Sequence, residues 1–318
     1  MFTISRYRFE LVATEHISMG ESGGARIRGA VLRGLSYFCP HFLKKNLFDE
    51  DHWKNCPVCK LVGAHPNQQF GDTASRPIVI QYAGQPNILP GQIWTFDMTL
   101  IGQQKKALPY LIASVNEFSQ GIGAPNNKTR QRGRSELLRV FEIHVNPKTE
   151  IYSSTKGLIC PNREVQNLPL SRNLWGMDKN GNAARSVKIE FLTPASLVRN
   201  GRLMDRFQFD VFCHRLLDRI AAFNKIYGDG EFIPIKELLR TARQVKVVST
   251  QTEMVDRYSF NTYERRKTPL NGLMGTVELI APKRAWEKLS PYLLLGQYIG
   301  VGKKVTKGNG LYRVVVME

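Results

Sequence analysis

The chain has 318 residues, of which 42% are hydrophobic, so it is long enough for two ordinary domains with apolar cores. It carries 45 Lys and Arg against 27 Asp and Glu, a formal net charge of +18. This excess favours an anionic partner, with nucleic acid first and a membrane surface second. Apolar runs fall short of the roughly 18 residues that a spanning helix needs, and the N-terminus lacks a signal-peptide core. Five cysteines, two of them in a Cys-x-x-Cys, favour a reducing cytoplasm over a disulfide framework.

The first half of the chain predicts the order strand, helix, strand, strand, helix, strand. These elements are expected at 2–11, 25–38, 76–83, 92–101, 108–120 and 137–145. The alternation of the first strand slips near Ser5 and Arg6, which indicates a bulge. The first helix has an apolar stripe and carries three arginines, Arg26, Arg28 and Arg33. Residues 39–72 lack periodicity and are expected to be irregular.

The second half predicts the same order with one extra short helix. Its elements are expected at 186–192, 205–227, 231–241, 245–250, 254–260, 276–280, 291–299 and 311–317. Ser290 and Pro291 are typical of an N-cap and a first helical position, and Gly272 and Gly275 indicate a turn. Between the halves, residues 146–184 are rich in Pro, Asn and Gly and predict a linker with one hairpin.

Each half ends with a helix, a glycine pair, a basic segment and a strand. In the C-terminal copy the glycines and the lysines between them are Gly300, Gly302, Lys303, Lys304, Lys307, Gly308 and Gly310. In the N-terminal copy, Gly121-Ile122-Gly123 precedes the cations Lys128, Arg130, Arg132 and Arg134. Glycine lets backbone approach a ligand, and lysines among backbone amides suit a phosphate chain. A flexible hairpin with solvated lysines is the alternative, but the repetition argues for two copies of one small fold.

These segments resemble the CRISPR precursor-RNA-processing endoribonucleases of the RAMP superfamily. The resemblance rests on the C-terminal glycine loop, on Arg28–Gly34 in the first helix and on Val187–Leu197 before the long helix. It spans nearly the whole chain and implies an α+β fold of tandem ferredoxin-like (RRM-like) βαββαβ domains. The expected parts are an N-terminal domain at 1–145 with an insertion at 39–72, a linker or hairpin at 146–184, and a C-terminal domain at 185–318.

The resemblance also implies an activity, the binding and cleavage of CRISPR repeat RNA to make guide RNAs. In that family cleavage needs no metal, and attack by the ribose 2′-hydroxyl leaves a 2′,3′-cyclic phosphate and a 5′-hydroxyl. Other CRISPR effector subunits are further expected partners. The alternative is a non-catalytic RAMP subunit that holds guide RNA in an effector complex. A third reading is an unrelated protein with two RRM-like units, although no aromatic RNP strand motif is evident.

The family places a catalytic histidine in or just after the first helix, which points to His41. Tyr37 and Lys44 lie near it in sequence and would position the phosphate and neutralise its charge, while imidazole suits proton transfer near neutral pH. His16, in the loop before the helix, is the second candidate. Either histidine has the alternative role of a surface or capping residue. RNA contacts are expected from the two glycine loops and their cations and from Arg26, Arg28 and Arg33.

Cys56-Pro57-Val58-Cys59 has the spacing of a metal knuckle, and Cys39 precedes it. His41, His52 and His65 are the candidates for a fourth ligand. A structural zinc would hold the irregular segment together, whereas reduced thiols without metal are the alternative. Zinc binding by His41 would occupy its lone pair and leave His16 as the catalytic candidate. No cofactor is expected for catalysis.

Overall fold

The computed structural model describes residues 1–41, 50–63, 76–143, 148–158, 186–230, 232–261 and 266–317. The chain divides into two compact units. Unit 1 comprises Met1–Leu168 and the short stretch Thr306–Gly308, and unit 2 comprises Pro169–Val305 and Asn309–Glu318. No helix in the described ranges is both long enough and apolar enough to cross a membrane.

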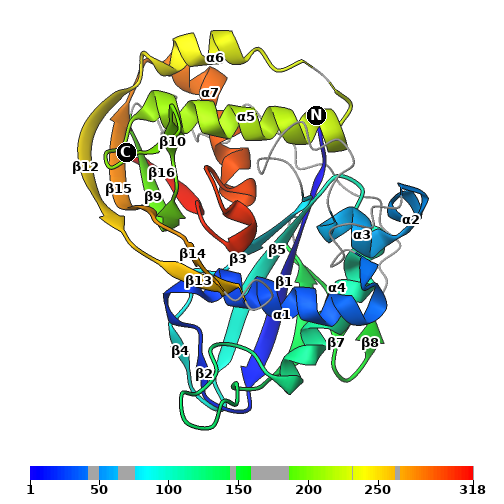
Figure 1. Cartoon of the computed structure of the whole chain (residues 1–318). Helices are drawn as coiled ribbons and strands as arrows, with labels where there is room; N and C mark the ends of the chain where they lie inside the picture. The colour runs from blue at the N-terminus through cyan, green and yellow to red at the C-terminus, as the bar shows by residue number, and fades with distance from the viewer. Residues whose placement is uncertain are drawn as a thin grey trace. The chain divides into compact units, whose positions relative to one another are not determined.

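Unit 1 contains an antiparallel sheet with β1 between β5 and β6 (Figure 1). The strands, in spatial order, are β3 (Ile78–Gln81), β5 (Ile93–Ile101), β1 (Ile4–Ala13), β6 (Ser135–Glu142), β7 (Thr149–Ser153) and β8 (Gly157–Leu158). A small pair joins β2 (Ile17–Ser18) to β4 (Asn87–Ile88). The helices are α1 (Gly23–Phe38), α2 (Glu50–Asn55), α3 (Pro57–Val62) and α4 (Leu108–Asn116). Side chains of α1, α3 and α4 share one apolar core with alternate residues of β1, Tyr7, Phe9 and Leu11.

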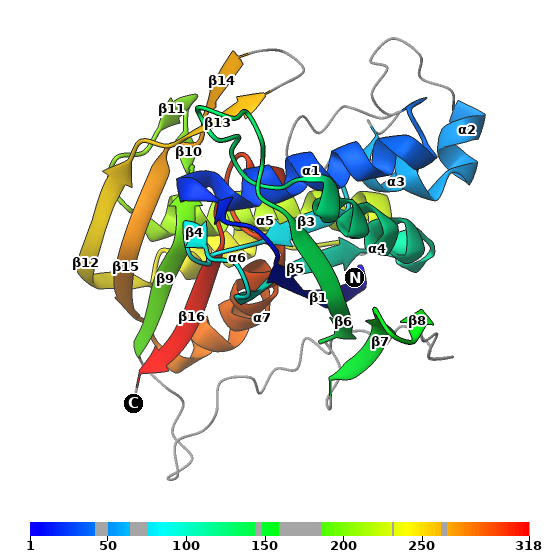
Figure 2. The same ribbon diagram turned by 90° about the horizontal axis from the view of Figure 1, so that it is seen from below.

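Unit 2 contains a four-stranded antiparallel sheet with α5, α6 and α7 on one face (Figure 2). Its strands, in spatial order, are β12 (Lys246–Val255), β15 (Gly272–Ile280), β9 (Ser186–Ala195) and β16 (Tyr312–Met317). The helices are α5 (Phe209–Tyr227), α6 (Ile235–Ala242) and α7 (Lys283–Ile299). Two hairpins complete the unit, β10 (Val198–Arg199) with β11 (Arg202–Leu203) and β13 (Tyr258–Asn261) with β14 (Arg266–Pro269).

The two units share one topology. Numbering the principal strands of each unit along the chain, both sheets have the order 2-3-1-4, as β3-β5-β1-β6 and as β12-β15-β9-β16. One helix segment lies between the first and second strands and another between the third and fourth. This is the βαββαβ arrangement, and it confirms the predicted class of tandem ferredoxin-like α+β domains.

Two local predictions are wrong in unit 1. The bulge lies between Glu10 and Leu11 against β6, while the pairing of β1 with β5 is continuous. The phase slip near Ser5 arises because Ile4 and Tyr7 lie on opposite faces of β1 and are both buried. The segment 39–72 is not irregular throughout, since its described part contains α2 and α3. The second of these is capped by Cys56, with Pro57 in its first turn.

In unit 2, α7 begins at Lys283, so Ser290 is not an N-cap and Pro291 lies inside the helix. Trp286 and Leu289 are buried before the proline, and their burial extends the helix where the local signal predicts its start. Gly275 and Gly272 do not form a turn but lie within β15. A Cβ on Gly275 would stand 2.0 Å from the carbonyl oxygen of Gln251, so this glycine permits close approach of two strands.

Candidate functional site

Helix α1 carries a row of arginines beside its buried stripe. Ile27, Val31 and Leu35 face the core of unit 1, which turns Arg26 and Arg33 toward the glycine loop of the same unit. Arg33 donates to the carbonyl of Gly121 in that loop. Arg26 Nη1 likewise donates to a main-chain carbonyl, Ser18 O, at 2.7 Å. Arg132, which comes from the glycine loop itself, donates to Gly123 O.

These arginines influence one another electrostatically. Burial lowers the pKa of Arg26, and the charge of Arg132 lowers it further. The pKa of Arg132 is likewise lowered, first by burial and then by the charge of Arg33. Carbonyl oxygens carry only partial negative charge, so they do not neutralise three guanidinium groups. This arginine cluster, Arg26, Arg33 and Arg132, therefore has the electrostatic character of an anion site.

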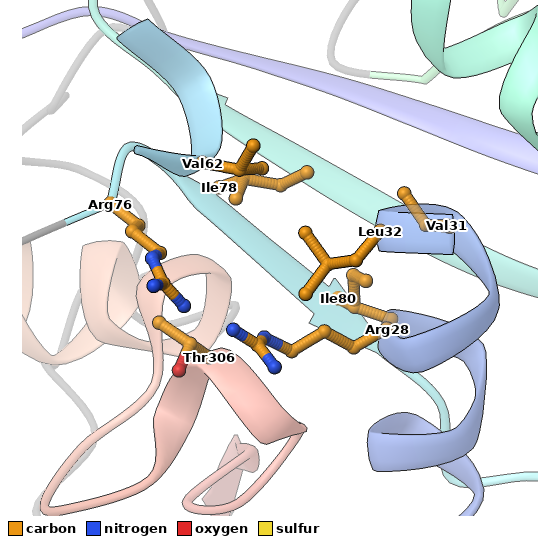
Figure 3. A pocket seen from close by; sticks show the side chains of 8 residues that line it. All are labelled: Arg28, Val31, Leu32, Val62, Arg76, Ile78, Ile80 and Thr306. Carbon is orange, nitrogen blue, oxygen red and sulfur yellow. The ribbon is translucent and has the colours of Figure 1, made fainter. Parts of the chain in front are cut away.

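A second pair of cations, Arg28 and Arg76, lies on another side of α1. The guanidinium groups of Arg28 and Arg76 both point into a small pocket (Figure 3). The rest of the pocket is lined by Thr306, which packs with unit 1, and by the apolar side chains of Val31, Leu32, Val62, Ile78 and Ile80. Burial and the nearby charge of Arg76 lower the pKa of Arg28 to about 9. Sequence reasoning missed Arg76, because sheet formation rather than a motif brings it to α1.

The glycines of the N-terminal loop permit close packing of main chain on main chain. Gly121 and Gly123 have φ angles of 134° and 87°, which disfavour any residue with a Cβ. A Cβ on Gly133 would stand 2.2 Å from the carbonyl oxygen of His16. The loop is thereby held against the segment before α1, and the exposed side chain of His16 lies next to it.

The C-terminal glycine loop is held by main-chain hydrogen bonds, both within the loop and to residues 194–196. Gly300, Gly302, Gly308 and Gly310 all have positive φ angles. A Cβ on Gly310 would stand 1.9 Å from Val301 O, and Val301 N donates to Gly310 O at 3.0 Å. Lys303 N and Gly310 N donate to Ser196 O and Pro194 O. Because protein carbonyls already receive these amide protons, the lysines rather than these amides are suited to a phosphate.

The lysines and the remaining basic residues differ in exposure. Lys303 is exposed, while Lys304 and Lys307 are half-buried. In the N-terminal loop, Lys128 and Arg130 are exposed, and Arg134 forms an ion pair with Glu15 at 3.6 Å. Within unit 1, a Cβ on Gly24 of α1 would stand 3.1 Å from Gly308 Cα. Lys307 and Gly308 therefore lie close to the N-terminal part of the arginine-bearing helix.

The two candidate catalytic histidines lie at opposite ends of α1. His16 precedes the helix and His41 follows it, and 16 helical residues span about 24 Å. The two imidazoles are therefore not brought to one phosphate. His41 is exposed, and so is Tyr37 in the last turn of α1, with 68% of its surface accessible. Lys44 lies outside the described residues.

The cysteine motif forms a compact cluster with one histidine. The ligand atoms of Cys39, His52, Cys56 and Cys59 all lie within 4.8 Å of one another. Cys39 Sγ lies 3.2 Å from His52 Nε2 and 3.5 Å from Cys59 Sγ. His41 is outside this group, and His65 lies outside the described residues. The spacing His52-x3-Cys56, one helical turn, is the sequence signal that could have selected His52.

Comparisons with known proteins agree with this architecture. Residues 189–312 match the family model of the CRISPR-associated endoribonuclease Cas6, and residues 2–165 match a model named AF_1859_N, described as an N-terminal domain. No curated protein matches the sequence.

Solved structures share the fold at low identity. A Thermus thermophilus Cas6 (TTHB231) is 16% identical, with 99% of each chain covered and a TM-score of 0.52. The Cas6 (TTHB231) product complex is 17% identical over 98% of this chain and 100% of that one, with a TM-score of 0.54. A partial Cas6-RT-Cas1–Cas2 complex matches all of this chain and 46% of its own, at 12% identity and a TM-score of 0.59.

Proposed function

We propose that this chain, whose residues 189–312 match the model of the CRISPR-associated endoribonuclease Cas6 family, binds CRISPR repeat RNA and cleaves it to make guide RNAs. The observation that carries this proposal is the arginine cluster, formed by two residues of α1 and one of the N-terminal glycine loop. Arg26, Arg33 and Arg132 lie within electrostatic reach of one another, and their charges meet only main-chain carbonyls in the hydrogen bonds described above. A polyanion would supply the missing countercharge.

The ribose-phosphate backbone suits this arginine cluster better than a small anion does. Arg26 and Arg33 lie seven positions apart on the same face of α1, which separates them by about 10 Å along the helix axis. A chain of phosphates would meet these cations in succession, whereas a single phosphate would meet only one part of the cluster. Lys303, Lys304 and Lys307 would add further phosphate contacts from the C-terminal loop.

His41 is the group that we assign to proton transfer. Its exposed imidazole would take the proton of a ribose 2′-hydroxyl as the 2′-oxygen forms a bond to the adjacent phosphorus. The bond from phosphorus to the 5′-oxygen then breaks, and that oxygen takes a proton from the imidazolium of His41, directly or through water. Arginine and lysine cations would stabilise the crowded phosphorane, and Tyr37 would position the reacting group. The products are a 2′,3′-cyclic phosphate and a 5′-hydroxyl, and this scheme needs no metal ion.

Association with other CRISPR proteins is part of the proposal. A structure that shares this fold is a Cas6-RT-Cas1–Cas2 complex. We therefore expect this chain to act alongside other CRISPR subunits. Co-purification from cells that carry its own CRISPR locus would test that association separately from RNA cleavage.

The decisive experiment incubates the pure chain with its repeat RNA in a chelator and maps both product ends. We expect a 2′,3′-cyclic phosphate upstream of the cut and a 5′-hydroxyl downstream. A substrate with a single 2′-deoxy nucleotide at the mapped position should bind but resist cleavage. A deoxy nucleotide one position away is the matched control and should be cut. Tight binding without cleavage of any repeat would favour a non-catalytic subunit of an effector complex instead.

A further inference from the structure

We propose that Cys39, His52, Cys56 and Cys59 bind one structural zinc ion that fastens α2 and α3 to the end of α1. The assignment does not depend on the proposed RNA chemistry, because it rests on side chains that the cleavage scheme does not use. It also names His52 as the fourth ligand, which leaves the imidazole of His41 unligated.

The spacing of the ligand atoms fits a tetrahedral ion. Zinc binds thiolate sulfur at about 2.3 Å and imidazole nitrogen at about 2.0 Å, so neighbouring ligand atoms stand about 3.5–3.8 Å apart. Cys39 Sγ lies 3.2 Å from His52 Nε2 and 3.5 Å from Cys59 Sγ, and no two of the four ligand atoms are more than 4.8 Å apart. Shifts of a few tenths of an ångström for the closer atoms, and of about 1 Å for the most distant, complete the tetrahedron.

The chemistry of the donor set also selects zinc. Three thiols and one imidazole are soft or borderline ligands, which favour zinc over magnesium or calcium. Four protein ligands close the coordination sphere and give a structural rather than a catalytic site. The amide of Cys59 lies 3.5 Å from Cys56 Sγ, so the turn directs an N–H group at a ligand sulfur as well. Cys39 and Cys59 are buried, and the other two ligands are half-buried.

The two short helices need such a fastening. Each of α2 and α3 has six residues, too few for a helix to be stable by itself in water. Helix α3 packs Val58, Leu61 and Val62 into the core of unit 1, but α2 buries no residue. Helix α2 is attached to the core through half-buried Trp53 and carries His52 at the cluster. A zinc ion would therefore fix α2 where hydrophobic burial is weakest.

The metal would also define the surroundings of His41. The His41 and His52 rings meet edge to face, with their centroids 4.3 Å apart. Coordination through Nε2 would hold the His52 ring still, and the His41 ring would then pack against a fixed surface. Cys39, only two residues before His41, would anchor the main chain on the other side. His41 would thus be positioned by the zinc site without belonging to it.

The test measures metal rather than activity. The full chain is purified under reducing conditions without added metal, and its zinc content is determined by mass spectrometry. We expect one zinc per chain. His52→Ala and Cys56→Ser should reduce that content well below one, while His41→Ala and Cys213→Ala should retain it. Cys213 is a matched control because it is a buried cysteine of unit 2, far outside the motif in sequence.

A second measurement covers variants that fail to fold. Cobalt exchanged into the wild-type chain should show thiolate-to-cobalt charge-transfer absorption and the visible bands of a tetrahedral ion. His41→Ala should leave that spectrum unchanged. Wild-type protein with no bound metal, in which the three thiols of Cys39, Cys56 and Cys59 react freely, would overturn the proposal, as would a Cys39–Cys59 disulfide found by peptide mapping. Loss of metal in His41→Ala but not in His52→Ala would overturn the ligand assignment. Absence of RNA cleavage would change none of these readings.

Discussion

The guanidinium groups of Arg28 and Arg76 point into one pocket of unit 1 whose lining is otherwise mostly apolar (Figure 3). Burial disfavours the charged form of Arg28 and the nearby charge of Arg76 adds to this, so the pKa of Arg28 is lowered to about 9. The charge of Arg28 therefore destabilises the RNA-free protein, whereas the same charge attracts a phosphate. The stability of the RNA-free protein and its affinity for RNA should therefore respond to Arg28 in opposite directions.

Arg28→Met should raise the melting temperature of the RNA-free protein by about 2 °C, corresponding to about 0.5–1 kcal/mol. The same variant should bind RNA more weakly. The folded-state pKa of Arg28 lies below its unfolded value of 12.5. The destabilisation of the folded wild-type protein by charged Arg28 is therefore full below about pH 9 and declines as the pH rises further. The difference in melting temperature between Arg28→Met and wild type should accordingly narrow above pH 9. The exposed Arg206→Met is the control, and an equal rise there would contradict this reading.

His41→Ala should reduce repeat cleavage at least about 100-fold, because the proton of the attacking hydroxyl loses its acceptor. RNA affinity should change little, since the charges that bind phosphate remain. Single-turnover cleavage and filter binding measure the two effects separately. His16→Ala is the matched variant and should cut normally, as its imidazole lies at the other end of α1. Loss of cleavage in His16→Ala with normal cleavage in His41→Ala would transfer the assignment to His16.

Changing the arginine cluster to glutamine should flatten the salt dependence of RNA binding. Each lost phosphate contact lowers the slope of log affinity against log salt by about 0.7 on single strands and about 0.9 on a duplex. Arg26→Gln, Arg33→Gln and Arg132→Gln together should therefore lower it by about 2–3. The matching triple variant at Lys303, Lys304 and Lys307 tests the C-terminal loop in the same titration. A slope equal to that of wild type would mean that the altered residues do not contact RNA phosphates.

Gly310→Ala should destabilise unit 2 by more than about 2 kcal/mol. The new Cβ would meet Val301 O at 1.9 Å and would also impose a side chain on a φ angle of 71°. Gly201→Ala separates these causes, because Gly201 has a φ angle of 80° but no heavy atom within 4 Å of its added Cβ. Gly201→Ala should lower the free energy of unfolding by about 1 kcal/mol, the cost of the positive φ angle alone. Chemical denaturation of both variants provides the comparison, and equal costs would mean that the loop relaxes around the new methyl group.

The sequence was sufficient for most of the fold and for part of the site. Alternation along β1 and the apolar stripes of α1 and α5 are local signals, and repetition of the helix–glycine–strand pattern revealed the duplicated unit. The error at Pro291 shows the limit of such signals, because Ser290-Pro291 has the composition of a helix start. The burial of Trp286 and Leu289, a tertiary effect, places the start two turns earlier.

Sequence analysis did not assign His52 as a ligand or find Arg76, and both omissions have one cause. His52 reaches Cys39 across 13 positions, and Arg76 reaches Arg28 across 48 positions. Both meetings depend on how α2 and β3 return to α1. The spacing of one helical turn links His52 to Cys56, but no spacing rule links His52 to Cys39 or Arg76 to Arg28. The glycine loops show the opposite case, since positive φ angles at Gly300, Gly302, Gly308 and Gly310 follow directly from residue type. Only the fold shows what those glycines approach, which is main chain in three cases and the side chain of Val305 in the case of Gly300.

Main-chain hydrogen bonds close the corresponding loops of both units, from Ile122 N to Gly133 O at 2.8 Å in the N-terminal loop and from Val301 N to Gly310 O at 3.0 Å in the C-terminal one. In the N-terminal loop two arginine side chains add to them, Arg33 on Gly121 O and Arg132 on Gly123 O. A phosphate drawn to either guanidinium group would compete with the loop carbonyl that now accepts from it. Occupation of the arginine cluster would therefore change the surroundings of the Gly121 and Gly123 carbonyls, and the loop backbone would report it.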